Sequence, residues 1–207
     1  MYSPAVSVYV NDFKTNQKQT KLMKRFFLLP VLALTMIFAN ATSAIAQEKT
    51  VMVGGAAMYP SKNIVENAIN SKDHTTLVAA VKAAGLVETL QGDGPFTVFA
   101  PTNAAFDMLP KGTVETLVKP ENKEKLTGIL TYHVVAGKMN AKDLKEKIKK
   151  GNGKAMLKTV QGEELTVMEK GGNIWVKDMK GNTAKVTIAD VNQSNGVIHV
   201  IDHVLMP

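Results

Sequence analysis

The sequence of 207 residues predicts an α+β domain with its helices in the first half and its strands in the second. Before Gly151, apolar residues recur at the three- and four-residue spacing of amphipathic helices, as in residues 74–85 and 113–131. After Gly151 the period becomes two, in short runs that glycine-containing turns separate. Helices followed by a meander of strands indicate segregated layers rather than alternating βαβ units.

An export signal is predicted ahead of this domain. Lys24 and Arg25 precede an apolar run at 26–39, which is shorter than the about 20 residues that a membrane-spanning helix needs. The Ala-Ile-Ala sequence at 44–46 fits the small-x-small pattern of a cleavage site. We therefore predict a signal peptide with an extended N-terminal flank over residues 1–46, with a retained membrane anchor as the alternative.

The length of the flank indicates that translation begins at Met23, and cleavage before Gln47 would leave residues 47–207 as the exported protein. No cysteine is present, which excludes disulfides and a lipid-modified cysteine anchor. The predicted location is therefore secreted or periplasmic, with no membrane span after cleavage.

The positive charge of the chain is a weak indication of a nucleic-acid partner. Of the net +7, residues 1–46 hold +4, from five basic residues against Asp12, so that +3 remains for the rest of the chain. A mildly basic domain does not need nucleic acid to explain it, and no such partner is predicted.

Local signals predict the boundaries of the first elements. Residues 47–60 are predicted to be an irregular segment, and residues 61–207 the folded domain. Asn63 with Glu66 three residues later fits the capping box of a short helix.

Two further helices carry recognisable ends. Asp73 is the predicted cap of the helix at 74–85, and Gly85 is its predicted C-terminal stop. Asn140 with Asp143 fits a second capping box, which opens a lysine-rich helix.

The strands are predicted from alternation and from the turns between them. The last strand is apolar on both faces, so we place it in the middle of a sheet that is covered on both sides. The predicted strands are 96–100, 155–160, 164–169, 173–179, 184–191 and 196–206.

Three stretches together resemble the signature segments of the fasciclin-type adhesion domain. They are TVFAPTNAAF at 97–106, YHVV at 132–135 and SNGVIHVIDHVLMP at 194–207. The resemblance runs from about Ser61 to Pro207 and is to the single-domain, secreted bacterial form. It implies a wedge-shaped β-sandwich with helices packed along one edge, and a role in cell–cell or cell–matrix adhesion.

Tyr132 and His133 are candidate binding residues, because the resemblance ties this segment to integrin recognition in animal members. The alternative is structural: a buried imidazole and a buried phenol each need hydrogen-bond partners, and such a pair can fasten a helix to a sheet. No nucleophile or orienting acid lies near them in sequence, so no catalytic residue is predicted.

Asp190 and Val191 resemble the aspartate-isoleucine pair that animal members present to integrins. The preceding Ile188 and Ala189 depart from the polar pair usual there. The alternative is a strand end with a turn aspartate.

His199 and His203 are not predicted to bind a metal. On one strand they would lie about 13 Å apart, too far for a single ion. We predict that His199 is a satisfied core residue of the signature and that His203 lies on the surface. No metal site and no cofactor are predicted.

Thr102, Asn103 and Phe106 belong to the first signature segment. A strand followed by Pro-Thr-Asn is most simply the cap of a helical turn, so these residues are predicted to be structural.

Trp175, the single tryptophan, is a further candidate binding residue. Alternation puts Trp175 and Lys177 on one face of their strand, and Trp175 is either core or a platform on which a sugar can stack. A cluster of lysines is either a solvated helix face or a site for an acidic polysaccharide or anionic surface. Its members are Lys142, Lys145, Lys147, Lys149, Lys150 and Lys154.

The predicted function is binding rather than catalysis, because the sequence has no GxSxG motif, no cysteine and no metal-spaced triad. The predicted partner is a surface or matrix protein or a polysaccharide. The alternative is a periplasmic module for a small molecule or a carbohydrate.

Overall fold

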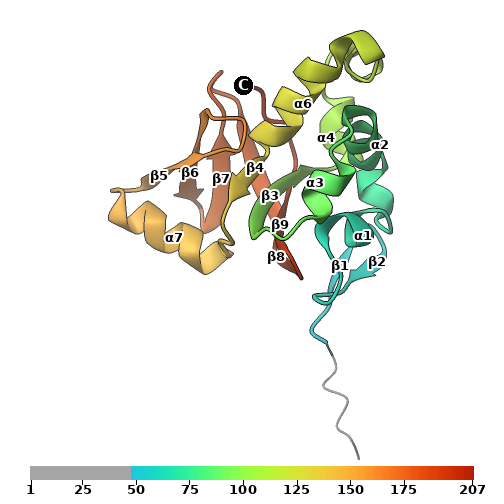
Figure 1. The fold of residues 1–207 in the computed structure, drawn as a ribbon. Coiled ribbons are helices and arrows are strands. Elements are labelled where there is room, and N and C mark those ends of the chain that lie inside the picture. The colour runs from blue at the N-terminus through green and yellow to red at the C-terminus, as the bar shows by residue number, and fades with distance from the viewer. Residues whose placement is uncertain (1–47) are drawn as a thin grey trace, which may run out of the picture. The chain divides into compact units, whose positions relative to one another are not determined.

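The computed structural model describes residues 48–207 (Figure 1). The predicted signal peptide and its cleavage site lie outside the described residues. Within them, no helix combines the length and the apolar character that crossing a membrane requires.

Seven strands form one sheet in the order β4-β3-β9-β8-β7-β6-β5. β3 and β9 are parallel, and every other neighbouring pair is antiparallel. The strands are β3 Phe96–Pro101, β4 Val134–Ala136, β5 Lys154–Lys158, β6 Glu164–Lys170, β7 Asn173–Lys177, β8 Thr183–Gln193 and β9 Gly196–Ile201.

The long strand β8 lets this sheet fold over on itself. Its pairing with β9 shifts register twice, between Val186 and Ile188 and between Ile188 and Val191. Such irregularities bend a strand and increase its twist. A single bridge between Val135 of β4 and Thr159 then brings the two ends of the sheet together. The result is a nearly closed, two-layered β-structure with helices beside it, which confirms the predicted α+β sandwich.

The helices lie mainly before the strand meander, as predicted. They are α1 Ile64–Ala68, α2 Thr75–Ala84, α3 Val87–Gln91, α4 Asn103–Asp107, α5 Thr113–Leu117, α6 Lys123–Tyr132 and α7 Ala141–Lys150, with 3-10 turns at Lys72–His74 and Pro120–Asn122. Both capping boxes are confirmed, at Asn63 with Glu66 and at Asn140 with Asp143. Gly85 ends α2 in the left-handed conformation, at φ 73°.

Two predicted elements differ from the structure. The region 113–131, predicted to be helical, is divided into α5 and α6, because Lys119 is extended before Pro120, and a residue before proline avoids the helical region. The predicted irregular segment at 47–60 contains a hairpin of β1 (Val51–Val53) and β2 (Ala56–Met58).

Glycines make this hairpin possible. Gly54 and Gly55 turn it with φ of 57° and 77°, where residues with side chains are strained. A Cβ atom on Gly54 would also collide with the backbone of the Lys72–His74 turn. The hairpin buries Val53 and Met58 against the sheet.

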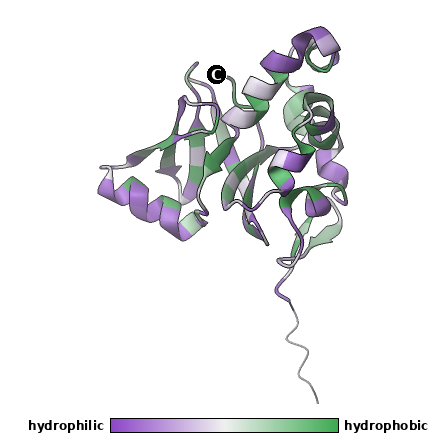
Figure 2. Cartoon of the chain, viewed as in Figure 1, coloured by the Kyte–Doolittle hydropathy of each residue, from purple (hydrophilic) through white to green (hydrophobic). Residues whose placement is uncertain are grey.

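Apolar side chains cover both faces of the middle of the sheet, and the strands there are coloured mostly as hydrophobic in Figure 2. One cluster fills the space between the two layers and includes Phe99, Ile201 and two residues of α7, Leu144 and Ile148. A second lies on the opposite face of β3 and β9, and a third joins α2, α4 and α6. All six residues of β9 are buried, which confirms the predicted central strand. The strand ends at Ile201, earlier than predicted.

Candidate functional site

Tyr132 and His133 lie where α6 meets the sheet, and both side chains are buried, with 0% and 3% of their surface exposed. The Tyr132 hydroxyl donates a hydrogen bond to the carbonyl of Glu164 at 3.1 Å and accepts one from the Met179 N–H at 3.1 Å. These bonds join the end of α6 to the start of β6 and to the turn after β7.

His133 connects α6 to the C-terminal segment. Its Nδ1 donates to the Ile129 carbonyl at 2.8 Å, and its Nε2 accepts from the Leu205 N–H at 3.0 Å. A proton on Nε2 would face the Leu205 N–H, so the neutral imidazole is the form that fits. Burial lowers the pKa of His133 to about 4.

Each polar atom of this pair therefore has a partner within the protein, which is the geometry of a fastener between helix and sheet. Recognition of a partner by Tyr132 and His133 stays a prediction.

His199 makes a second buried junction. Its Nε2 donates to the Met139 carbonyl at 2.9 Å, its Nδ1 accepts from the Asp190 N–H at 3.4 Å, and its ring stacks on Phe99 with centroids 5.8 Å apart. Burial lowers its pKa. His203, by contrast, is exposed and pairs with Asp202 at 2.8 Å.

Asp190 sits at a bulge inside β8 rather than at the predicted strand end, with φ of 60°. The left-handed conformation is one that aspartate tolerates better than most residues. It aims the carboxylate at α7, where Oδ1 accepts from the Ala141 N–H at 2.6 Å. A carboxylate at this end of a helix is favourable. Val191 is 1% exposed. A role of the pair in recognition stays a prediction.

Residues of the first signature segment begin two helices. The Thr102 hydroxyl accepts from the Ala105 N–H at 3.3 Å and so caps α4. Asn103 Oδ1 accepts from the Thr76 N–H at 3.0 Å, so it satisfies the first turn of α2. The predicted cap of α2, Asp73, was wrong: no local side chain caps this helix, and the partner comes from a distant segment.

Phe106, the third of these residues, is partly buried against the cluster that joins α2, α4 and α6. It also borders a surface hollow of about 430 Å³ beside the loop from α4 to α5. A smaller apolar cavity of about 50 Å³ lies between α2 and the sheet.

Trp175 lies on β7 between the buried Ile174 and Val176 and points to the opposite face. The side chain is half-buried, between the two alternatives that the sequence left open. Its Nε1 is shielded from solvent and has no hydrogen-bond partner among residues 48–207. Lys177 lies on the same face and is exposed, as the alternation predicted.

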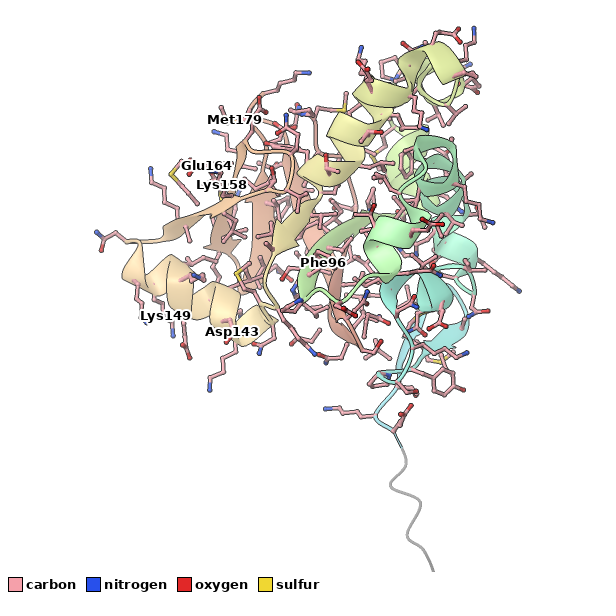
Figure 3. The ribbon with its side chains drawn as sticks, viewed as in Figure 1. Phe96, Asp143, Lys149, Lys158, Glu164 and Met179 are labelled. Carbon is pink, nitrogen blue, oxygen red and sulfur yellow. The ribbon has the colours of Figure 1, made fainter. Side chains whose placement is uncertain are left out.

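The lysine cluster is split by the fold. α7 buries Leu144 and Ile148 on one side and carries its lysines on the other sides, as Figure 3 shows for Lys149. Lys145 forms a salt bridge with Glu169 at 3.0 Å. Lys154 belongs to β5 instead, on the face that carries Trp175.

Sequence reasoning missed several residues that hold the fold. Asn195 accepts from the Ile64 N–H at 3.0 Å and donates to two carbonyls around α3, at Leu90 and Gly92. Ser71 Oγ lies 2.9 Å from His74 Nδ1, with both residues buried. Hydrogen bonds made by single polar side chains leave no periodic pattern in the sequence from which they could be predicted. Within residues 48–207, no group of three or more possible ligands is placed to hold a metal ion.

Comparison with known proteins identifies the class. The model of the Fasciclin domain matches residues 72–207, so the chain belongs to this family. A solved pair of FAS1 domains from the insect cell adhesion molecule fasciclin I has the same fold, with a TM-score of 0.64 and 20% identity. That match covers 72% of this chain and 52% of the other, so the chain spans about half of the two-domain structure.

Two relatives are similar along most of their length. Protein sll1483 of Synechocystis is 51% identical over 160 residues, which are 77% of this chain and 82% of the relative. The cell surface glycolipoprotein MPB83 of Mycobacterium bovis is 32% identical over 186 residues, 80% of this chain and 77% of the relative.

Proposed function

We propose that this chain is an exported binding module that attaches to a surface or matrix component, a protein or a polysaccharide, and carries out no reaction. The observation that carries the proposal is membership of the Fasciclin domain family over residues 72–207. The solved neighbour is named a cell adhesion molecule, and MPB83 is named a cell surface protein.

The geometry of the candidate residues supports binding over catalysis. Tyr132, His133 and His199 have their polar atoms bonded to the backbone inside the protein, where a substrate has no access. General acid–base chemistry needs a group within hydrogen-bond reach of the substrate. The exposed side chains include lysines and single apolar residues such as Met156 and Met179, which suit a contact surface.

Attachment of the purified protein to immobilised matrix proteins and polysaccharides tests the proposal. We expect saturable, weak binding that strengthens when the protein is presented in many copies. Heat-unfolded protein is the control for nonspecific adsorption. Failure of the folded protein to attach to any of these surfaces would contradict the proposal.

Export is tested separately. Fractionation of the producing cell should find the protein in the periplasm or the culture fluid, with Gln47 as its first residue. Retention of the full chain in the cytoplasm would show that residues 1–46 are not a signal.

The alternative function, a module for a carbohydrate, is favoured by one observation. Trp175 is an aromatic side chain on a face of the sheet that also carries exposed lysines.

A further inference from the structure

We propose that the outer face of β5–β8 binds an acidic polysaccharide, with Trp175 as a stacking platform and Lys154, Lys170, Lys177 and Lys185 as the groups that meet its carboxylates. The outer face is the set of side chains that point away from the cluster between the two layers. This inference rests on the proposed binding function and names the class of partner.

The strands alternate between the two faces. Leu157, Leu165, Val167, Val176 and Ala184 point into the cluster between the layers. Their neighbours in sequence point outward and are exposed or half-exposed, including Met156 with 62% of its surface exposed. The helix next to these strands, α7, packs its Leu144 and Ile148 into the inner cluster, so it lies against the other face.

The strand register gathers lysines around Trp175. Lys185 of β8 lies directly opposite Trp175 on one side, and Met168 of β6 lies opposite on the other. Lys154 follows Met168 in the same row, on β5. Side chains directly opposite each other have Cβ atoms about 5 Å apart, so this row is one continuous surface.

Two more lysines lie near Trp175 on the outer face. Lys177 is two residues along β7 from Trp175 and therefore on its face. Lys170 pairs with Asn173, which is two residues from Trp175 in the other direction. The indole thus has a lysine beside it along its own strand, one across the sheet and one on a diagonal.

The positive charge of residues 48–207 is concentrated in the segment that contains α7 and the strands around Trp175. Residues 137–185 hold twelve lysines and six acidic residues, a net of +6. Residues 48–136 hold eight lysines and nine acidic residues, and residues 186–207 hold two acidic residues and no lysine. The remainder of the domain is therefore slightly negative, and a polyanion would be steered to the strands and α7.

Within residues 48–207, no salt bridge neutralises the lysines around Trp175. Among residues 48–207, the salt bridges are Lys145 with Glu169 and His203 with Asp202. Glu164 also points outward, but it lies opposite Lys158 in the strand register, at the end of the face, where Figure 3 labels both residues. The Asp202 carboxylate accepts a hydrogen bond from the backbone N–H of Lys185 at 2.7 Å and forms no salt bridge with the Lys185 side chain.

The chemistry of the face favours a polysaccharide over nucleic acid. Residues 48–207 contain no arginine, the residue that reads phosphate and guanine in a bidentate manner. Lysine is a point charge on a long stem and meets a carboxylate without a fixed geometry. The flat, half-exposed indole offers an apolar surface to the ring of a sugar between those charges, and the partial burial of Trp175 holds it in place.

The single tryptophan makes the site directly observable, because all tryptophan fluorescence comes from Trp175. We expect oligomers of polygalacturonate to change this fluorescence saturably, and neutral dextran to leave it unchanged. Added salt should weaken the binding, since the lysines supply most of it.

Matched variants locate the site. Lys154→Gln/Lys177→Gln/Lys185→Gln should weaken polygalacturonate binding by about tenfold. The control Lys142→Gln/Lys149→Gln/Lys150→Gln removes the same charge from the exposed sides of α7 and should change binding by less than about threefold. Trp175→Leu should weaken attachment to immobilised polygalacturonate, with the fold verified by thermal unfolding.

Equal losses in the two triple variants would overturn the site and leave only diffuse charge. Binding of a DNA duplex or of anionic lipid vesicles as strongly as polygalacturonate would overturn the class of partner. If the first triple variant still attaches to cells or matrix as the unmodified protein does, this inference fails while the proposed function stands. If the unmodified protein attaches to nothing, the proposed function itself fails.

Discussion

The half of the sheet formed by β4, β3 and β9 is covered on both faces, whereas β5, β6, β7 and the first part of β8 have one face in solvent. In the covered half, the side chains of Tyr132, His133 and His199 form hydrogen bonds with backbone groups of distant segments. In the open half, among residues 48–207, Trp175 Nε1 has no hydrogen-bond partner and the lysines around it form no salt bridge.

The contrast between the two halves of the sheet shows that residue type alone does not identify a binding site. Tyrosine next to histidine is typical of a functional pair in a sequence, yet both side chains are buried and each of their donors and acceptors has a partner. The residues free to meet a partner are those for which the fold supplies no partner. Four predictions test this difference between the two halves.

His133→Ala should lower the free energy of unfolding by about 4 kcal/mol, because it opens a cavity and leaves the Leu205 N–H and the Ile129 carbonyl without partners. Denaturant unfolding measures the loss. His203→Ala, an exposed histidine, should change it by less than about 0.5 kcal/mol. Similar values for the two variants would remove the distinction between buried and open histidines.

Acid should lower the free energy of unfolding of the protein through the buried histidines of the covered half. The pKa of His133 is about 4 in the folded protein and 6.5 in the unfolded chain, so the unfolded chain takes up this proton first as the pH falls. The stabilisation is complete above pH 6.5 and is lost towards pH 4, by about 3 kcal/mol for this group. His74 and His199 shift in the same direction.

Unfolding free energies at several pH values measure this effect. His133→Gln should flatten the dependence between pH 6.5 and pH 4, and His203→Gln should leave it unchanged. A wild-type protein equally stable at both ends of this range would contradict the buried, neutral imidazole.

Asp190→Ala should cost about 2 kcal/mol, since it removes the carboxylate from the start of α7 and leaves a residue other than glycine at positive φ. Asp190→Asn keeps an acceptor and tolerates the conformation, so it should cost less than half as much. Thermal unfolding separates the two variants. If both lose the same stability, the interaction with α7 is not what holds Asp190.

The substitution Lys154→Gln/Lys177→Gln/Lys185→Gln should change the free energy of unfolding by no more than about 1 kcal/mol, because exposed or half-buried lysines that form no salt bridge within residues 48–207 contribute little to stability. Denaturant unfolding is the measurement. A loss as large as that of His133→Ala would place these side chains among the structural residues and end the contrast between the two halves.

Features with local causes were predictable from the sequence. The two capping boxes, the left-handed stop at Gly85 and the buried strand β9 each follow from a few neighbouring residues. The hairpin of β1 and β2 was missed because three-residue strands are too short to show alternation, although Gly54 and Gly55 mark its turn.

Features with distant causes were not predictable. Asn103 completes α2, Asp190 completes α7, and His133 binds Leu205, 72 residues further along the chain. The sequence placed Trp175 and Lys177 on one face, but Lys170 and Lys185 join them through pairings with other strands. Turn lengths determine such register, so counting across Gly171 and Gly181 would have found both lysines.

The place of β9 in the sheet has a consequence for the order in which the chain can fold. β9 is the last of the seven strands to be synthesised, yet β3 and β4 reach the other strands in the sheet order only through it. In a nascent chain that ends before residue 196, the pair β3–β4 and the strands β5–β8 share only the bridge between Val135 and Thr159, and the core is incomplete. Contacts that join Phe96 to Gly196 span a long loop, and such topologies form slowly. The seven-stranded sheet can therefore be completed only after residues 196–201 have been synthesised.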